Sequence, residues 1–119
     1  MGTMGEDFVA AIAKRDREGL KTLLADDVDF KGLTPSLFWR AENPDDVEAI
    51  VFDHWFDEME VTAIPVLGTD DVAGINQIGY RFDVDTRLGP RVVEQQAYYK
   101  VKEGRITFVR LVCSGFRIP

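Results

Sequence analysis

The chain has 119 residues, of which 45% are apolar and 11% aromatic. This composition suits one packed domain over residues 1–119 and excludes a disordered chain. The formal net charge of −7 disfavours binding to nucleic-acid phosphates and to anionic membrane surfaces.

Helical periodicity dominates the first half of the chain. Apolar spacing predicts helices over Gly5–Arg15 and Arg17–Leu24, followed by a short strand at Val28–Phe30. Glycine and proline within 32–36 predict a loop. Asn43 as N-cap and Pro44 as first residue predict a third helix. One face of that helix carries Val47, Ile50, Val51, His54 and Trp55.

From Met59 onward the apolar period changes to two, which predicts a meander of strands. Pro65 indicates an edge strand or a bulge in the first of them. Helices followed by such a meander predict an α+β fold, with helices on one face of an antiparallel sheet. The expected strands are Val61–Leu67, Ile75–Thr86, Arg91–Lys102 and Arg105–Phe116, with a turn over 68–71.

The hairpin turns predict the register of the last three strands. A type I turn with a glycine bulge over 102–104 places Tyr99 opposite Thr107. A three-residue loop over 88–90 places Asp83 opposite Gln95 and Arg81 opposite Ala97.

In this register Arg81, Asp83, Gln95 and Tyr99 share one face. Both faces are half apolar, which predicts helices over one and a second subunit over the other. If the first face meets the helices, Arg81 and Asp83 share a buried site. If the second face does, they form a surface pair that contributes little.

The numbers of cysteine and histidine residues indicate the cellular compartment and limit metal binding. A single cysteine, Cys113, excludes an intramolecular disulfide and is typical of a cytoplasmic protein. No apolar run approaches the ~20 residues of a membrane helix. One histidine and one cysteine cannot build the common zinc sites, and Asp26-Asp27-Asp29 matches no calcium loop. We therefore expect no metal and no cofactor.

Four segments resemble the nuclear transport factor 2-like superfamily, which includes SnoaL-like polyketide cyclases, ketosteroid isomerases and limonene epoxide hydrolases. The resemblance covers nearly the whole chain. It implies a cone-shaped, curved antiparallel (mixed) sheet wrapped around the N-terminal helices, a cystatin-like α+β roll with a central pocket. Members are often dimers through the outer sheet face. The segments are Phe8–Ala11, Leu23–Val28, the helix that begins at Pro44, and Tyr98–Ile106.

Arg81-Phe82-Asp83 is similar to the Arg-x-Asp of limonene epoxide hydrolases, which implies that both charged side chains face the pocket. The water-activating set is incomplete, because Leu111 follows Arg110 where that family has aspartate. Phe38-Trp39-Arg40 likewise stands where that family positions water. No set matches the ketosteroid isomerases, and the SnoaL-like pattern leaves His54 and Asp83 as its acid–base candidates.

The candidate catalytic residues are therefore Asp83, Arg81 and His54. Asp83 would act as general acid or base, Arg81 would hold its charge or polarise a substrate oxygen, and His54 would shuttle a proton. Each also has a structural interpretation, as an ion pair for Arg81 and Asp83 and as a core histidine for His54.

The candidate substrate-binding residues are mainly aromatic. Trp39, Trp55 and Phe38 could form a wall for an apolar ligand, or ordinary core. Gln95 could orient a ligand or satisfy the Asp83 carboxylate, and the Tyr99 hydroxyl could donate to a ligand or pack in the core.

The sequence thus predicts a small-molecule-binding pocket protein, a cofactor-independent hydrolase, isomerase or cyclase acting on an apolar substrate. The alternative is a ligand-binding or dimeric interaction module without chemistry. The expected partners are an apolar small molecule and a second copy of the chain.

Overall fold

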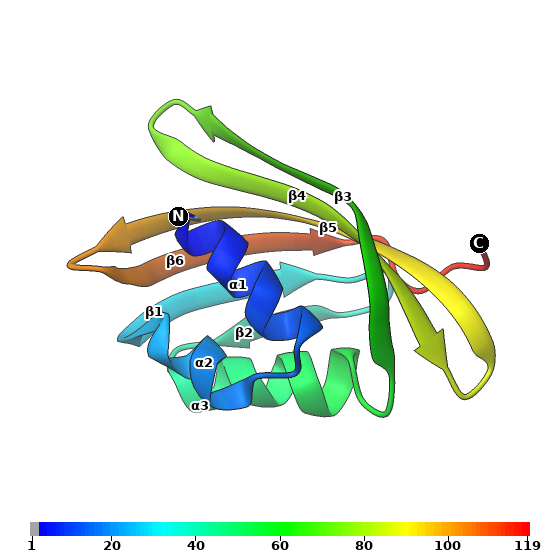
Figure 1. Ribbon diagram of the computed structural model, residues 1–119. Helices are drawn as coiled ribbons and strands as arrows, with labels where there is room; N and C mark the ends of the chain where they lie inside the picture. Colours follow the sequence, from blue (N-terminus) through cyan, green and yellow to red (C-terminus); the bar gives the residue numbers. More distant parts are fainter. Residues whose placement is uncertain (1–2) are drawn as a thin grey trace.

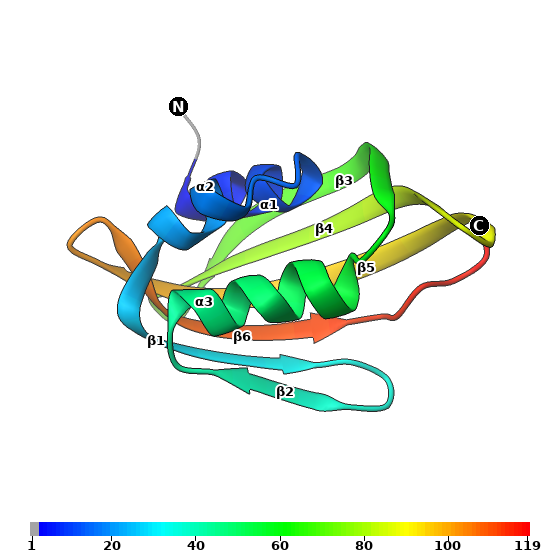
Figure 2. The same ribbon diagram turned by 90° about the horizontal axis from the view of Figure 1, so that it is seen from below.

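A computed structural model describes residues 3–119. The chain forms a curved six-stranded sheet with its helices on one side (Figures 1 and 2), which confirms the predicted α+β fold. The helices are α1 (Met4–Ala13), α2 (Arg17–Thr22), α3 (Pro44–Glu48) and the π-helix η1 (Ala49–Trp55). The strands are β1 (Leu24–Leu33), β2 (Phe38–Ala41), β3 (Glu60–Val72), β4 (Ile75–Thr86), β5 (Gly89–Lys102) and β6 (Arg105–Cys113).

The strand order is β2-β1-β6-β5-β4-β3, so β2 and β3 form the edges. β1 pairs with β6 in parallel, whereas the other pairs are antiparallel, and the sheet is mixed. Figure 2 shows α3 and η1 running along the inside of the curve, with α1 beside them. The face under the helices is called the inner face below, and the opposite one the outer face.

Helices α1 and α3 begin with side-chain N-caps, of which the sequence predicted the one at Asn43. Asn43 Oδ1 accepts from the Asp46 N–H at 2.8 Å, with Pro44 as the first helical residue, as predicted. Thr3 and Glu6 form a capping box at the start of α1. The backbone N–H of Gly5 then donates to the Tyr99 hydroxyl at 2.9 Å. A methyl group at Gly5 would collide with the Tyr99 ring, so glycine lets α1 lie close to β5.

The π-helix corrects the predicted face of the third helix. In η1 the Phe56 N–H donates to the Val51 carbonyl, five residues back, and this wider winding rotates later side chains relative to an α-helix. Ile50, Val51 and Trp55 are buried as expected. His54 is exposed, however, and Phe52 takes the inner position instead. The interpretation of His54 as a core residue is therefore wrong.

The predicted register between β4 and β5 is also wrong. Thr86 pairs with Gly89 around a two-residue turn, instead of a three-residue loop over 88–90. Gly89 has a φ of +102°, so it starts β5 in a conformation that favours glycine. The pairing is thereby shifted by three residues, so that Asp83 lies opposite Val92 where the sequence predicted Gln95. Because side chains alternate along a strand, this odd shift turns every side chain of β4 to the other face. Tyr80 and Phe82 therefore lie inside, and Arg81 and Asp83 outside.

Between β5 and β6 the pairing differs from the prediction by two residues, which leaves the faces unchanged. Glu103 and Gly104, both at positive φ, make a tight turn between Lys102 and Arg105. A bulge then follows between Lys100 and Val101. As a result Tyr99 lies opposite Val109, where the sequence predicted Thr107.

Pairing extends two strands beyond their predicted ends. β1 covers ten residues because both of its edges are paired, with β6 and β2. β3 continues through the turn expected over 68–71, and the chain reverses at Ala73-Gly74, both at positive φ. The prediction that Pro65 marks an edge strand with a bulge is confirmed by register shifts on either side of Ala63.

Candidate functional site

Arg81 and Asp83, the strongest candidates from sequence, lie on the outer face. Arg81 pairs with Glu94 of β5 and Asp83 with Val92, and both side chains are half-buried. They line an open depression of about 500 Å³, which Arg91 also borders. Within residues 3–119 no ion pair joins Arg81 to Asp83. The expectation that these side chains face the helices is wrong.

Gln95 occupies the centre of the inner face. Its exposed fraction is 1%, and it is the one buried amide or charged side chain in the part of the chain that the structure describes. Its Oε1 accepts from the Tyr80 hydroxyl at 2.6 Å. Tyr80 and Cys113 are its neighbours on β4 and β6, so a row of three polar side chains crosses the apolar interior.

Two buried donors on the inner side have no hydrogen-bond partner among the described residues, namely Gln95 Nε2 and Trp55 Nε1. A buried donor without an acceptor costs about 1–3 kcal/mol. The Trp55 ring packs on Gly32 of β1, which pairs with Leu111, two residues from Cys113. Trp55 therefore lies over β1, on the same face as Gln95 but two strands away from it.

Burial strongly raises the pKa of the Tyr80 phenol above its ordinary value of 10.0, and the Cys113 thiol nearby raises it further. Desolvation acts in this direction because the phenolate would lose its hydration inside the core. Tyr80 therefore stays a neutral donor at all physiological pH values. Since the Tyr80 O–H is donated to Gln95 Oε1, the pair offers the N–H groups of Gln95 to its surroundings.

The other candidate binding residues are divided between the two faces. Trp39 lies on the inner side, where its Nε1 donates to Thr34 Oγ1 at 3.0 Å and its ring packs against His54 and Trp55. Tyr99 is buried, and its hydroxyl accepts from Gly5. Phe38, in contrast, is 55% exposed on the outer face. The structure thus brings Trp39, Trp55, His54 and Gln95 to one side and separates them from Phe38, Arg81 and Asp83.

Aromatic side chains fill the interior of the cone. Phe30, Phe52, Phe56 and Phe82 are fully buried, and edge-on contacts link Phe82 to Phe56 and Phe56 to Phe116. An enclosed space of about 10 Å³ lies between α1 and the sheet, with apolar walls. Such a space holds one water at most and is the kind that stays dry.

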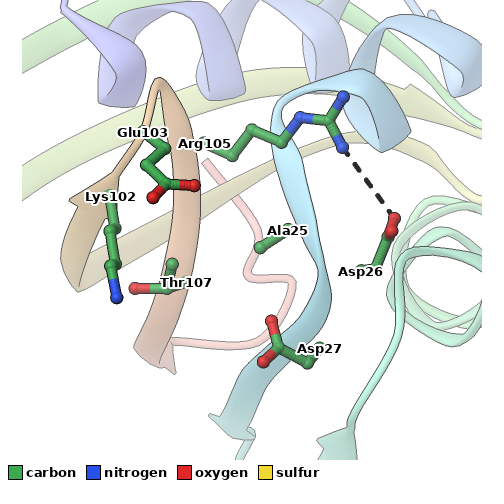
Figure 3. Close-up of a pocket in the computed structure, with 7 residues that line it drawn as sticks. All are labelled: Ala25, Asp26, Asp27, Lys102, Glu103, Arg105 and Thr107. Atoms are coloured by element: carbon green, nitrogen blue, oxygen red, sulfur yellow. Dashed lines mark ion pairs between the residues drawn. The ribbon is translucent and has the colours of Figure 1, made fainter.

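A larger surface hollow of about 530 Å³ lies where β1 bulges away from β6 (Figure 3). Its side chains are mostly charged and exposed. Asp26 and Arg105 approach to 3.8 Å, and Lys102 and Glu103 lie beside them (Figure 3). Opposite charges alternate around an open hollow, which is typical of a solvated surface. Across residues 3–119, no group of three or more potential ligand side chains could hold a metal ion.

Sequence reasoning missed Tyr80 and the polar row. The predicted register, with Arg81 on the same face as Gln95, implies the opposite face for Tyr80, whereas the two-residue turn makes Tyr80 and Gln95 neighbours. The signal was Gly89 itself, because glycine directly after a two-residue turn can begin a strand.

No protein-family model and no curated protein matches the chain. Solved structures do match. A candidate isomerase from Bacillus subtilis has a TM-score of 0.76 at 13% identity, covering 93% of this chain and 84% of its own. A protein from Catenulispora acidiphila with a ketosteroid isomerase-like fold, solved with trimethylamine, has a TM-score of 0.72 at 14% identity. This match covers 96% of this chain and 87% of that protein. An LEH-like epoxide hydrolase from M. tuberculosis has a TM-score of 0.66 at 15% identity, and the match covers 93% of this chain and 80% of the hydrolase.

These likenesses identify the fold of the chain as the nuclear transport factor 2-like cone, as the sequence resemblance implied. The fold is shared by isomerases, cyclases and epoxide hydrolases among others. At identities of 13–15% they define the architecture, and activity has to be argued from this chain's own side chains. Within residues 3–119, no helix has the length and apolar character to cross a bilayer.

Proposed function

We propose that the chain binds a small, mostly apolar molecule carrying an acceptor oxygen, inside the cone between η1 and strands β4–β6. The observation that carries this proposal is the pair of unpartnered buried donors, Gln95 Nε2 and Trp55 Nε1. A carbonyl or ether oxygen beside either donor would relieve the cost of leaving that donor unpaired.

The preference for an acceptor follows from the orientation of the Gln95 amide. With Oε1 accepting from the Tyr80 hydroxyl, both amide N–H groups remain free and Nε2 has no partner among the described residues. A reversed amide would instead present the Oε1 carbonyl, and a donor on the ligand would satisfy it. The orientation in the structure therefore favours an acceptor on the ligand.

Entry of a ligand needs the aromatic side chains around the donors to separate. Two neighbouring segments are suited to this. η1 lacks α-helical hydrogen bonding, and π-helical turns are frequent at functional sites. The segment 114–119 pairs with β5 through Ser114–Glu94 and Arg117–Val92, and places Phe116 against Phe56.

The test uses a bicyclic ketone, 2-decalone, and decalin, the hydrocarbon with the same rings. We expect the ketone to shift the side-chain amide signal of Gln95 and the indole N–H signal of Trp55 in NMR spectra. Gln95→Met should weaken ketone binding about tenfold, which corresponds to ~1.4 kcal/mol, the size of one net hydrogen bond. Gln96→Met, on the exposed outer face, is the matched control. Equal binding of both probes, or equal effects of both variants, would overturn the proposal.

A second candidate function is catalysis by Asp83 with Arg81, on an apolar substrate bound in the outer depression. It is favoured by the position of both side chains on the wall of that hollow, where a carboxylate beside a guanidinium can transfer a proton. Turnover of an epoxide or enone that falls with Asp83→Asn at unchanged melting temperature would support it. Turnover unaffected by this substitution would exclude it. His54 would take part only if the substrate reached the rim beside Trp39, since His54 lies on the helical side.

We also propose that the chain is a homodimer through its outer face. Leu33, Phe38 and Val112 are neighbours in register there, and each is more than half exposed. Large apolar side chains grouped on a sheet face are typical of an interface. Sedimentation should therefore show twice the 13.4 kDa mass of the chain, and a monomer at high concentration would contradict the proposal.

A further inference from the structure

The two edge strands of the sheet differ in how well they are protected from pairing with another chain. β2 has 4 residues and carries Arg40, and both a short length and a cation discourage pairing at an edge. β3 has 13 residues, and after Pro65 it contains no further proline, lysine or arginine. The β3–β4 hairpin forms the upper edge of the molecule in Figure 1. The far side of β3 is therefore open to an additional strand.

The turn at the end of β3 decides which of its backbone groups point to this open side. Val72 and Ile75 are paired across a two-residue turn, so they exchange backbone hydrogen bonds with each other. Bonded and non-bonded pairs alternate along an antiparallel ladder, which directs the N–H and C=O groups of Leu67, Thr69 and Asp71 away from β4. These groups are the ones that an additional strand would bind.

Apolar side chains of β3 are exposed on both faces of the sheet. Val66 pairs with Arg81 and therefore points to the outer face, whereas Leu67 pairs with Tyr80 and points to the inner face. Both side chains, together with Val72, are 45–54% exposed. An edge strand that leaves apolar side chains uncovered on its two faces is typical of a strand that receives a partner.

The charge of this hairpin selects the partner. From Glu60 to Tyr80 the sequence contains three acids and no lysine or arginine. Asp70 and Asp71 are adjacent, and Asp70 Oδ1 accepts from the outward N–H of Asp71 at 2.7 Å, which holds one carboxylate at the open edge. A second copy of β3 would bring the same carboxylates and a net charge of −7. Like charges disfavour that pairing, and a cationic segment suits the edge.

We propose that β3 binds an extended segment of a partner polypeptide as an additional antiparallel strand. The segment has two consecutive lysines or arginines, which meet Asp71 and Asp70, followed by β-branched residues that cover Val66 and Leu67. Its backbone bonds to Leu67 and Thr69. In strand addition of this kind the main chain provides affinity and the alternating side chains provide specificity. The edge is separate from the interior site and from the outer face, so this inference does not rest on the functions proposed above.

The first test uses the N-acetylated, amidated heptapeptide VKKTVIV, whose lysines lie opposite Asp71 and Asp70 in the antiparallel register. Amide hydrogen exchange at Leu67 and Thr69 should slow by about tenfold or more at saturation. Exchange at Gly68 and Asp70 should change little, because the alternation already bonds their N–H groups to β4.

N-methylated peptides test whether the main chain makes the contact. A peptide N-methylated at the residues opposite Leu67 and Thr69 should not bind, because the methyl groups replace the required donors. A peptide N-methylated at the residues opposite Gly68 and Asp70 should bind as well as the parent peptide. Equal binding of the two methylated peptides would overturn strand addition.

The last test changes the charge on each side. Asp70→Asn combined with Asp71→Asn keeps an oxygen that can accept from the Gly74 N–H, and should weaken binding of VKKTVIV about fivefold. Asp57→Asn, at another exposed acid, is the control and should leave binding unchanged, as melting temperatures should stay in both variants. The peptide VEETVIV should bind at least about tenfold more weakly than VKKTVIV.

Three results would contradict the proposal. One is the absence of VKKTVIV binding at about 1 mM peptide, and another is equal binding of the lysine and glutamate peptides. The third is exchange at the edge amides that slows as the concentration of the chain alone rises, which would make a second copy the occupant of this edge.

Discussion

At the scale of single residues, the main feature is a polar pair enclosed by aromatic side chains. Tyr80 and Gln95 satisfy one hydrogen bond between them, and the donors that remain define what the interior can accept. The effect of Tyr80 on stability depends on the protonation of its phenol, since the core tolerates the neutral phenol and excludes the phenolate.

Alkaline unfolding tests the burial of Tyr80. Because the folded state raises the phenol pKa above the ordinary value of 10.0, the unfolded chain loses this proton first as pH rises. The contribution of the buried Tyr80 phenol to the free energy of unfolding is therefore fully present below about pH 10. It decreases above that pH by up to about 1.4 kcal/mol per pH unit. Denaturant titrations of wild type and Tyr80→Phe at pH 7–11 should show a shallower alkaline loss in the variant. Parallel curves would contradict the buried, neutral phenol.

At the scale of elements, two irregular features position the interior side chains. The π-helical winding of η1 turns Phe52 and Trp55 inward and His54 outward. The close approach of α1 to β5 at Gly5 ties the first helix to the sheet through the Tyr99 hydroxyl. The approach at Gly5 is tertiary in origin, because it depends on the Tyr99 hydroxyl that β5 presents to the helix.

Removal of the Tyr99 hydroxyl should loosen α1. Tyr99→Phe leaves the Gly5 N–H buried without its acceptor, and we expect a loss of about 1–3 kcal/mol in the free energy of unfolding. Tyr98→Phe removes the same group from the preceding residue, on the outer face, and should cost under about 0.5 kcal/mol. Hydrogen exchange would locate the effect in α1, and equal losses for the two variants would argue against the contact.

At the scale of the whole molecule, a curved sheet separates two environments. The inner face is closed by helices and by the chain end at Phe116. The outer face is left with exposed apolar side chains. Ligand entry and dimerisation are therefore assigned to opposite sides, and variants of one should leave the other unchanged.

Phe116 should control access to the interior. Phe116→Ala removes an edge-on contact with Phe56, and we expect a loss of about 1–2 kcal/mol in stability from the apolar area exposed. Binding of a hydrophobic dye such as ANS should increase. Ile118→Ala, at a position 79% exposed, is the control and should behave as wild type. No difference between the two variants would mean that the chain end does not close the cone.

Local signals were sufficient for much of the architecture. Asn43 and Pro44 placed the third helix, the change of period after Met59 placed the meander, and Pro65 marked the edge. These features depend on neighbours within a few residues, so the sequence contains them. The candidate site was only partly predictable: Gln95 and Trp55 were identified, whereas Tyr80 was missed and Asp83 was placed on the wrong face.

The sequence by itself determined the order and type of the elements and the apolar pattern of each one, because propensity, capping and periodicity act locally. The tertiary structure decided which face of β4 turns inward, since a two-residue turn before Gly89, in place of a three-residue loop, reverses every side chain of that strand. It also decided that β1 joins β6, that η1 winds as a π-helix, and that Gln95 meets Tyr80. The pairing of β1 with β6 depends on contacts between residues far apart in the chain, whereas the Tyr80–Gln95 contact follows from the turn before Gly89.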